Sequence, residues 1–416
     1  MNNSRAFLFS LFETAVHACL PSVCLDKHLD HIDTSRGVCV IGAGKASADM
    51  AAAVFKKYGD ACYGKVVTRY GYGTELATGN IEILYASHPV PDKNSLLAGK
   101  ALLELVAQTP PDIPIIFLIS GGGSALMSIP VEGVSFADKM ELHRFLLRSG
   151  ASIDEMNVVR KQLSAVKGGK LAEAAKSISH TYVISDVVGD DPSLIASGPT
   201  VKDNSTAELA LTILEKYNWQ PIDSIYQFLT KAIKSKCITP PSNTSHYTVV
   251  ANAHQAIDAA VAKAKNAGWE THVLNYEQQG EASRIAKEHA AIALKFRDDG
   301  KKVLLFSGGE LTVTIDSATG DGGPNQEYLL AMAIALDGAS GISVLSCDSD
   351  GVDGSKDIAG GFIDESTLTT AKSKGLSPQS YLANHDSFHF LQAVGGLIIT
   401  GPTRTNVNDF RVIMIN

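Results

Sequence analysis

Four apolar segments of the sequence each end in a serine that glycine or aspartate follows closely. They are FLIS at 117–120, YVIS at 182–185, LLFS at 304–307 and SVLS at 343–346. Without a Cβ, glycine lets the backbone adopt a positive φ, approach a ligand closely and direct successive N–H groups at one anion. An isolated Gly-Gly pair is often only a tight turn, but its recurrence at segment ends favours a site for an anion rich in oxygen atoms.

The residues that follow these segments are of the types that phosphate chemistry requires. In an open parallel sheet a ligand lies beyond the carboxyl ends of the strands, so we expect a site there. Carboxylates near a phosphate hold Mg²⁺ or accept the proton of an attacking hydroxyl, and the sequence leaves open which acid does which. The candidates are Ser120, Gly121, Gly122, Gly123, Ser124, Asp186, Asp190, Gly309, Glu310, Asp350 and Asp353.

Lys45 lies between a predicted strand and a predicted helix, directly after Gly42-Ala43-Gly44. This is a weak dinucleotide signal, because Ser47 replaces the third glycine and no acid closes a second strand about twenty residues on. It is not a P-loop either. An ammonium at a helix N-terminus would nevertheless serve a phosphate, which the helix dipole and free amides already favour. The alternative is a solvated surface lysine.

A second cationic feature is the segment 156–178, which we predict as a helix with a buried apolar stripe. Asn157, Arg160, Ser164 and Lys167 recur along a different face at spacings of three and four. Two glycines directly after Lys167 are costly inside a helix and indicate a close approach. This face either holds the oxygens of a polyphosphate or is simply solvated. Glycines, cations and acids without an activated cysteine or a nucleophile-elbow serine favour phosphoryl transfer.

Short apolar runs alternate with longer helical patterns along the chain, which predicts parallel sheets covered by helices on both faces. Proline, serine, threonine and asparagine cluster at 235–247, where we predict a break. We therefore expect an α/β protein with two domains, 1–235 and 247–416, each built on a mostly parallel sheet flanked by helices.

The composition of the chain argues against several other classes of protein. A net charge of −8 over 416 residues argues against general nucleic-acid binding. No apolar run approaches the ~20 residues of a membrane span, and the N-terminal segment lacks a convincing cleavage site, so we expect a cytoplasmic protein without a membrane segment. The six cysteines form no C-x-x-C pair, which favours buried thiols over disulfides or a zinc site.

Seven long motifs, taken together and in this order, resemble those of the class II glycerate kinases, which carry a C-terminal MOFRL domain. They are FLISGGGSALM, NVVRKQLSAVKGGKLA, ISDVVGDDPSLIASGPT, FSGGELTVTI, GGPNQE, DGVDGSKDIAGGFID and GPTRTNVNDF. The resemblance covers nearly the whole chain, from about residue 5 to about residue 412. It implies ATP- and Mg²⁺-dependent phosphorylation of D-glycerate to 2-phosphoglycerate, in a cleft between two α/β domains.

Carried over residue by residue, the resemblance implies site residues in both domains. Lys45, Arg160, Asp186 and Asp190 correspond to catalytic positions, and the two aspartates are also the candidate Mg²⁺ ligands. The implied binding residues are Gly44, Ser120, Gly121, Gly122, Gly123, Ser124, Lys167, Gly309, Glu310, Asn325, Glu327, Asp350, Asp353, Thr405, Asn406 and Asp409. The oligomeric state stays open, with a homodimer as one form.

Two departures from the family pattern bear on this assignment. Many relatives have an arginine where this chain has Pro324, which offers neither charge nor N–H. Arg404 stands where relatives often have glycine, and we hypothesise that it replaces the missing arginine.

Two other function classes are weighed: an NAD(P)H-dependent hydroxypyruvate reductase, a name that some relatives carry, and a non-catalytic protein that binds sugar acids.

Overall fold

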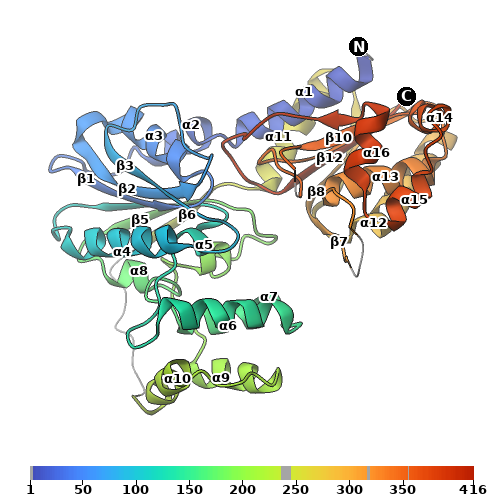
Figure 1. Cartoon of the computed structure of the whole chain (residues 1–416). Coiled ribbons are helices and arrows are strands. Elements are labelled where there is room, and N and C mark those ends of the chain that lie inside the picture. Colours follow the sequence, from blue (N-terminus) through green and yellow to red (C-terminus); the bar gives the residue numbers. More distant parts are fainter. Residues whose placement is uncertain (1–2, 236–244, 316–318, 355) are drawn as a thin grey trace. The chain divides into compact units, whose positions relative to one another are not determined.

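Two six-stranded sheets organise the structure, a computed structural model that describes residues 3–235, 245–315, 319–354 and 356–416. The chain divides into two compact units (Figure 1). The parallel-sheet unit comprises Cys24–Val250, and the mixed-sheet unit comprises residues 1–23 together with 251–416. Residues 236–244, the centre of the predicted break, lie outside the described part of the chain.

The sheet of the first unit has the strand order β3-β2-β1-β4-β5-β6 and is parallel throughout, as the alternation of strands and helices predicted. Its central strands β1 and β4 are buried along their whole length, which explains the continuous apolar runs in the sequence. The strands are β1 (Val38–Ala43), β2 (Cys62–Arg69), β3 (Asn80–Ala86), β4 (Ile115–Ile119), β5 (Ser179–Ile184) and β6 (Ser245–Ala251).

The helices of the parallel-sheet unit form two groups. The helices α3 (Ser47–Tyr58) and α4 (Lys93–Gln108) pack against the strands, and a capping box fixes the start of α4. A second group shares a separate apolar cluster, and Figure 1 shows it apart from the strands. Its members are α6 (Phe136–Arg148), α7 (Ile153–Gln162), α9 (Ala207–Lys216) and α10 (Asp223–Ser235). The short helices of this unit are α5 (Gly123–Leu126) and α8 (Lys170–Glu173), and α2 (Pro21–Cys24) spans the boundary between the two units along the chain.

The sheet of the second unit is mixed, so the prediction of a mostly parallel sheet is wrong here. Only β7 and β8 are neighbours in parallel, and β12 runs antiparallel to β8 and β9. A parallel connection needs a crossover of a dozen or more residues, usually a helix. No helix is described between β9 and β10, and β10 returns beside β9 in the antiparallel direction. The strands are β7 (Glu270–Glu281), β8 (Val303–Thr312), β9 (Ile342–Asp348), β10 (Gly360–Ile363), β11 (Leu397–Ile398) and β12 (Asp409–Ile415).

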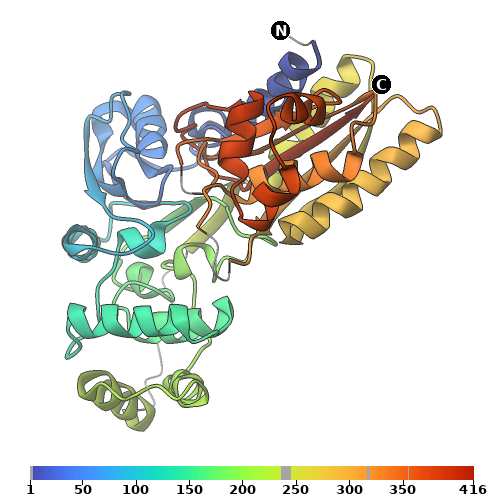
Figure 2. The ribbon, with the colours of Figure 1, turned by 45° about the vertical axis from the view of Figure 1, so that its right-hand side comes forward.

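The N-terminal helix α1 (Asn3–Ala18) belongs to the mixed-sheet unit, whereas the sequence grouped it with residues up to 235. It packs against α11 (Ala253–Asn266), as Figure 2 shows. The ammonium of Lys263 donates to the Ser10 carbonyl at 2.9 Å and to Thr14 Oγ1 at 3.0 Å. These contacts tie the start of the chain to a helix that follows it by more than two hundred residues, which local sequence patterns cannot reveal.

The helix α13 (Pro324–Leu336) lies at the centre of the second unit's core and is buried on nearly all sides. It packs between α12 (Ala282–Asp298) and α16 (Ser387–Val394). The remaining helices of the unit are α14 (Thr367–Ser373) and α15 (Pro378–Ala383). Among the described residues, no helix has both the length and the apolar character that crossing a membrane demands.

Candidate active site

The ends of β1 and β4 interlock through backbone and serine contacts. The N–H of Lys45 donates to the Gly121 carbonyl at 2.9 Å, and the N–H of Ala46 donates to Ser120 Oγ at 3.0 Å. Gly44 has a φ of +144°, and a Cβ there would lie 2.1 Å from Ser120 Oγ, so only glycine fits. The structure thus brings these residues together at the carboxyl edge of the parallel sheet, where the sequence predicted a site.

After Ser120 the chain passes through Gly121, Gly122 and Gly123, the glycine turn, and enters α5. Gly122 has a φ of +82°, and a Cβ on it would lie 3.0 Å from the His88 ring. A Cβ on Gly123 would lie 2.8 Å from the Ala43 carbonyl, so the turn packs directly on the end of β1. The sequence predicted the close approach of the glycines but missed His88, since nothing in the local pattern links residue 88 to this turn.

Lys167 reaches the same turn from beyond the end of α7. Its Nζ donates to Ser124 Oγ at 2.7 Å, and Ser124 Oγ lies 3.0 Å from Ser197 Oγ. The side chain of Lys167 is buried, and its pKa is lowered well below the usual value by burial, with smaller effects from Lys139 and Arg160. A buried ammonium held by a serine, with no carboxylate within ion-pair distance among the described residues, is a candidate anion-binding group.

Arg160 lies on α7 in the same region. Burial lowers the pKa of its guanidinium, its Nε has no hydrogen-bond partner, and its NH2 group contacts only the sulfur of Met156, at 3.8 Å, among the described residues. Asn157, one turn earlier, is also buried. The basic face of this segment is therefore not a solvated one, which resolves the alternative that the sequence left open for Asn157 and Lys167.

The prediction of one continuous helix over 156–178 is wrong. The helix α7 ends at Gln162, and α8 begins only at Lys170. Between them Gly168 and Gly169 have φ values of +62° and +85°, in the left-handed region that helices do not use. The two glycines end the helical path instead of packing inside it, and the turn so formed carries Lys167.

Asp186 and Asp190 follow β5, the strand beside β4. Both are partly buried, and the N–H of Asp190, which has a φ of +51°, donates to the Val187 carbonyl at 3.1 Å. The buried Tyr247 hydroxyl has no hydrogen-bond partner in the described structure; burial, with Asp190 and Asp191, raises its pKa. In the described part of the chain, no group of three or more His, Cys, Asp or Glu side chains is placed to hold a metal ion.

In the mixed-sheet unit, Asp353 caps the start of α13. Its carboxylate accepts the backbone N–H of Asn325 at 3.0 Å and that of Gln326 at 2.9 Å. Burial raises the pKa of Asp353 to about 6, although these hydrogen bonds oppose the rise. A carboxylate of the chain itself therefore occupies the helix N-terminus.

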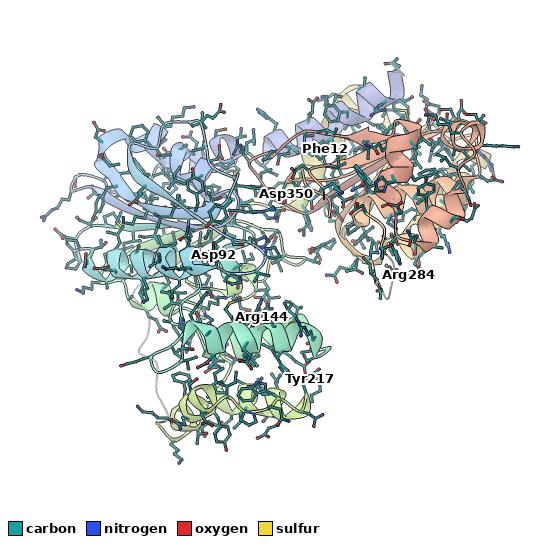
Figure 3. The ribbon with its side chains drawn as sticks, in the orientation of Figure 1. Phe12, Asp92, Arg144, Tyr217, Arg284 and Asp350 are labelled. Carbon is teal, nitrogen blue, oxygen red and sulfur yellow. The ribbon has the colours of Figure 1, made fainter. Side chains whose placement is uncertain are left out.

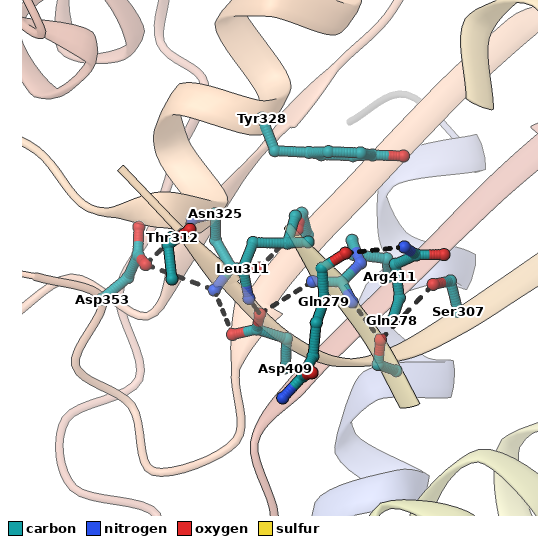
Figure 4. A network of polar contacts seen from close by, with 12 residues as sticks. Gln278, Gln279, Ser307, Leu311, Thr312, Asn325, Tyr328, Asp353, Asp409 and Arg411 are labelled. Carbon is teal, nitrogen blue, oxygen red and sulfur yellow. Dashed lines mark hydrogen bonds and ion pairs between the residues drawn. The ribbon is translucent and has the colours of Figure 1, made fainter. Parts of the chain in front are cut away.

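Asp409 joins Asp353 in one buried network, which Figure 4 shows. The amide Nδ2 of Asn325 donates to Asp409 Oδ1 at 2.6 Å, and the N–H of Leu311 donates to Asp409 Oδ2 at 3.2 Å. Arg411 NH1 donates to Asp409 Oδ2 at 2.7 Å, and NH2 donates to the Gly308 carbonyl. The structure thus gathers Asn325, Asp353 and Asp409 as the sequence implied, but their polar groups hold the last residues of β8 and the start of α13.

Arg411 is the residue of this network that the sequence did not single out. It is almost fully buried, beside the Tyr328 ring at 5.8 Å from guanidinium carbon to ring centroid. An arginine within the apolar run DFRVIMI is the signal that could have found it, because a charged residue is rarely buried without a partner.

The other predicted residues of this unit lie in three settings. Glu327 is buried, burial raises its pKa, and its Oε2 lies 2.8 Å from His385 Nδ1. Asp350, Thr405 and Asn406 are buried in the loops after β9 and before β12. Glu310 is exposed at the end of β8, after Gly309 with φ +87°, and Arg404 is partly exposed with φ +73°.

The fold and the site define an α/β protein whose parallel sheet carries a glycine turn and buried cations at its carboxyl edge. The MOFRL family model matches residues 303–409, and a domain of unknown function, DUF4147, matches residues 7–230. A crystal structure of glycerate kinase from Thermotoga maritima is similar, with a TM-score of 0.91, 36% identity and complete coverage of both chains.

Full-length relatives agree with this likeness. D-glycerate 2-kinase of Thermotoga maritima is 39% identical, over 99% of this chain and 98% of its own. Glycerate 2-kinase of Pyrococcus horikoshii is 37% identical, over 91% of this chain and 87% of its own. A protein of Agrobacterium vitis that carries the provisional name hydroxypyruvate reductase is 43% identical, over 99% of this chain and 95% of its own. The chain belongs to the DUF4147 and MOFRL family of glycerate kinases.

Proposed function

We propose that the protein transfers the γ-phosphoryl group of ATP to the C2 hydroxyl of D-glycerate, giving 2-phosphoglycerate and ADP. The observation that carries the proposal is the buried Lys167 ammonium on Ser124, directly after the glycine turn at the end of β4. A dry cation beside a glycine turn stabilises the charge of a transferring phosphoryl group or of a bound oxyanion. The names of the kinase relatives support the same reaction.

The residues of the parallel-sheet unit take the following roles in this proposal. Lys45 and the glycine turn hold the donor phosphates, because Lys45 precedes α3 and its backbone is fixed to the turn. Arg160 and Lys167 neutralise the charge of bound oxyanions. Asp186 or Asp190 orients the glycerate hydroxyl and accepts its proton.

Magnesium fits these residues. Mg²⁺ is usually bound through one or two carboxylates together with substrate phosphates and water, so a separate cage of protein ligands is not required. Asp186 and Asp190 supply carboxylates beyond β5, beside the strand that carries the glycine turn. When bound, the ion would supply positive charge that neutralises the phosphate oxygens.

The roles of the mixed-sheet unit follow from burial. Exposed Glu310 and partly exposed Arg404 are the residues best placed to meet a ligand, whereas Gly309 is buried against the backbone of β7. Asn325, Asp353 and Asp409 support them by fixing the last residues of β8. An active site in a cleft between the two units stays a prediction, as does a homodimer.

The cosubstrate distinguishes a kinase, which uses ATP, from a hydroxypyruvate reductase, which uses NADH. With D-glycerate, ATP and Mg²⁺ the purified protein should release ADP, and with hydroxypyruvate it should leave NADH unoxidised. EDTA should abolish ADP release, because it removes the Mg²⁺ that would neutralise the phosphate charge. Oxidation of NADH in the absence of ATP would overturn the kinase assignment.

Replacement of Arg404 by glycine should weaken substrate binding without weakening the fold. The backbone of Arg404 has a φ of +73°, a conformation that is unfavourable for arginine but not for glycine. The Arg404→Gly variant should therefore be as stable as the parent, or more stable by up to ~1 kcal/mol. If Arg404 supplies the charge that Pro324 lacks, the KM for ATP or for D-glycerate should rise by about tenfold. Steady-state kinetics and urea unfolding check both parts, and unchanged constants for both substrates would end the hypothesis.

A further inference from the structure

The helix α6 carries two basic residues that face the buried cations described above. Lys139 and His143 lie one helical turn apart, and residues so spaced share a face. Lys139 is 8% exposed, and its Nζ donates to the Ile129 carbonyl at 2.9 Å. The sequence patterns did not single out either residue.

The charged groups that act most strongly on His143 are cations. They are Arg160 of α7, Lys167 of the following turn, and Lys139 and Arg144 of α6 itself, where Figure 3 shows Arg144. Burial comes first, and together with these cations it lowers the pKa of His143 to about 4, so the ring is neutral near pH 7. Lys139 faces Lys170 of α8 in addition. The region therefore concentrates positive charge in a poorly hydrated place.

The acids near this region interact with other lysines, Lys161 and Lys170. Asp203 forms an ion pair with Lys161 at 3.8 Å, and Asp203 and Glu173 act on Lys170. The ammonium of Lys170 also donates to two carbonyls, those of Lys161 at 2.8 Å and Ser164 at 2.7 Å. Among the described residues, no acid lies within ion-pair distance of Lys139, Arg160 or Lys167. Buried cations without a counter-ion are costly, and an anionic ligand would remove that cost.

We propose that Lys139, His143, Arg160 and Lys167, the α6–α7 cation cluster, bind the carboxylate of D-glycerate. A kinase reaction brings together two anions, the donor phosphates and the acceptor carboxylate. The Lys45 turn lies at the start of α3, where the helix dipole suits phosphates. The α6–α7 cation cluster comes from α6, α7 and the turn that follows α7, and it is largely buried, which suits a small acceptor. The identity of the anion rests on the proposed function.

Binding at this cluster should take up protons. Burial lowers the pKa of Lys139 to about 7, and it lowers that of Lys167 as well. A bound carboxylate favours the charged ammonium, so the pKa of Lys139 rises in the complex. Protons are then taken up near and above pH 7, and the affinity for glycerate falls as the pH rises beyond the pKa of the free protein.

Isothermal titration calorimetry of D-glycerate, without ATP, tests this site directly. Measurements near pH 7 and about pH 8.5, each in two buffers of different ionisation enthalpy, give the affinity and the number of protons bound. For the parent protein we expect proton uptake and a Kd that rises about tenfold over this range. Lys139→Met should raise the Kd near pH 7 about tenfold and weaken the pH dependence, and His143→Gln should raise the Kd by a similar factor. Arg148→Met, which removes an exposed cation from the end of α6, should bind as the parent does.

Each other outcome separates the alternatives. An unchanged glycerate affinity with a raised KM for ATP would assign the cluster to the donor phosphates. A lower melting temperature for both variants, with unchanged affinity and pH dependence, would make these residues structural and overturn the proposal. If the parent protein binds glycerate with the expected proton uptake but transfers no phosphoryl group, the proposed function fails while the site stands. If it phosphorylates glycerate and neither variant differs from it, only the site fails.

Discussion

Lys45→Met lowers kcat/KM for phosphoryl transfer by ~10²-fold or more, because a charge that stabilises the transition state in a dehydrated site is worth about 3 kcal/mol. The protein should still fold, since the backbone N–H of Lys45, which methionine retains, makes the bond to Gly121. Steady-state kinetics and circular dichroism measure the two effects. Lys56→Met, at an exposed position on α3, is the matched control and should keep parental kinetics.

A folded Lys45→Met variant with normal kinetics would remove the lysine from the catalytic assignment. A variant that does not fold would show instead that the side chain is part of the structure of the turn. Either result would leave Lys167 and Arg160 as the cations that carry the reaction.

Arg411→Met should destabilise the mixed-sheet unit by about 3–5 kcal/mol, because it leaves the buried Asp409 without its charged partner. Each unit contains one of the chain's two tryptophans, Trp219 and Trp269. Urea unfolding followed by Trp269 fluorescence in a Trp219→Phe background therefore reports on this unit. Arg284→Met breaks an exposed ion pair with Glu288 on α12 and should cost less than about 1 kcal/mol.

A loss below about 1 kcal/mol for Arg411→Met would contradict this account of the network. It would mean that Asn325 and the Leu311 amide satisfy Asp409 without the guanidinium. The last residues of β8 would then be held by the pairing of the strand with β7 and β12.

Much of the parallel-sheet unit could be predicted because its information is local. Continuous apolar runs identified β1, β4 and β5, and parallel pairing places their carboxyl ends at one edge, so Lys45 and the glycine turn were expected there. The helix over 156–178 was predicted too long, because apolar spacing persists through Gly168 and Gly169 although their backbone conformations end the helix.

Features that depend on distant contacts could not be predicted. The direction of β12 and the place of α1 depend on pairing with segments hundreds of residues away. An acid in a glycine-rich loop has the same sequence signal whether it faces a ligand or caps a helix, as Asp353 does. Lys139 and His143 look like part of a solvated charged face, because DKMELHR contains both signs of charge. Only the packing of α6 near α7 shows that both residues lie beside the buried cations Arg160 and Lys167.

The most direct test of the central claim is the fate of the product. D-glycerate, ATP and Mg²⁺ are incubated with the purified protein and enolase, and phosphoenolpyruvate is followed with and without phosphoglycerate mutase. Transfer to the C2 hydroxyl predicts that phosphoenolpyruvate forms without the mutase, and that its formation requires ATP. A strict requirement for the mutase would place the phosphoryl group on C3, and the absence of any ATP-dependent product would contradict the kinase itself.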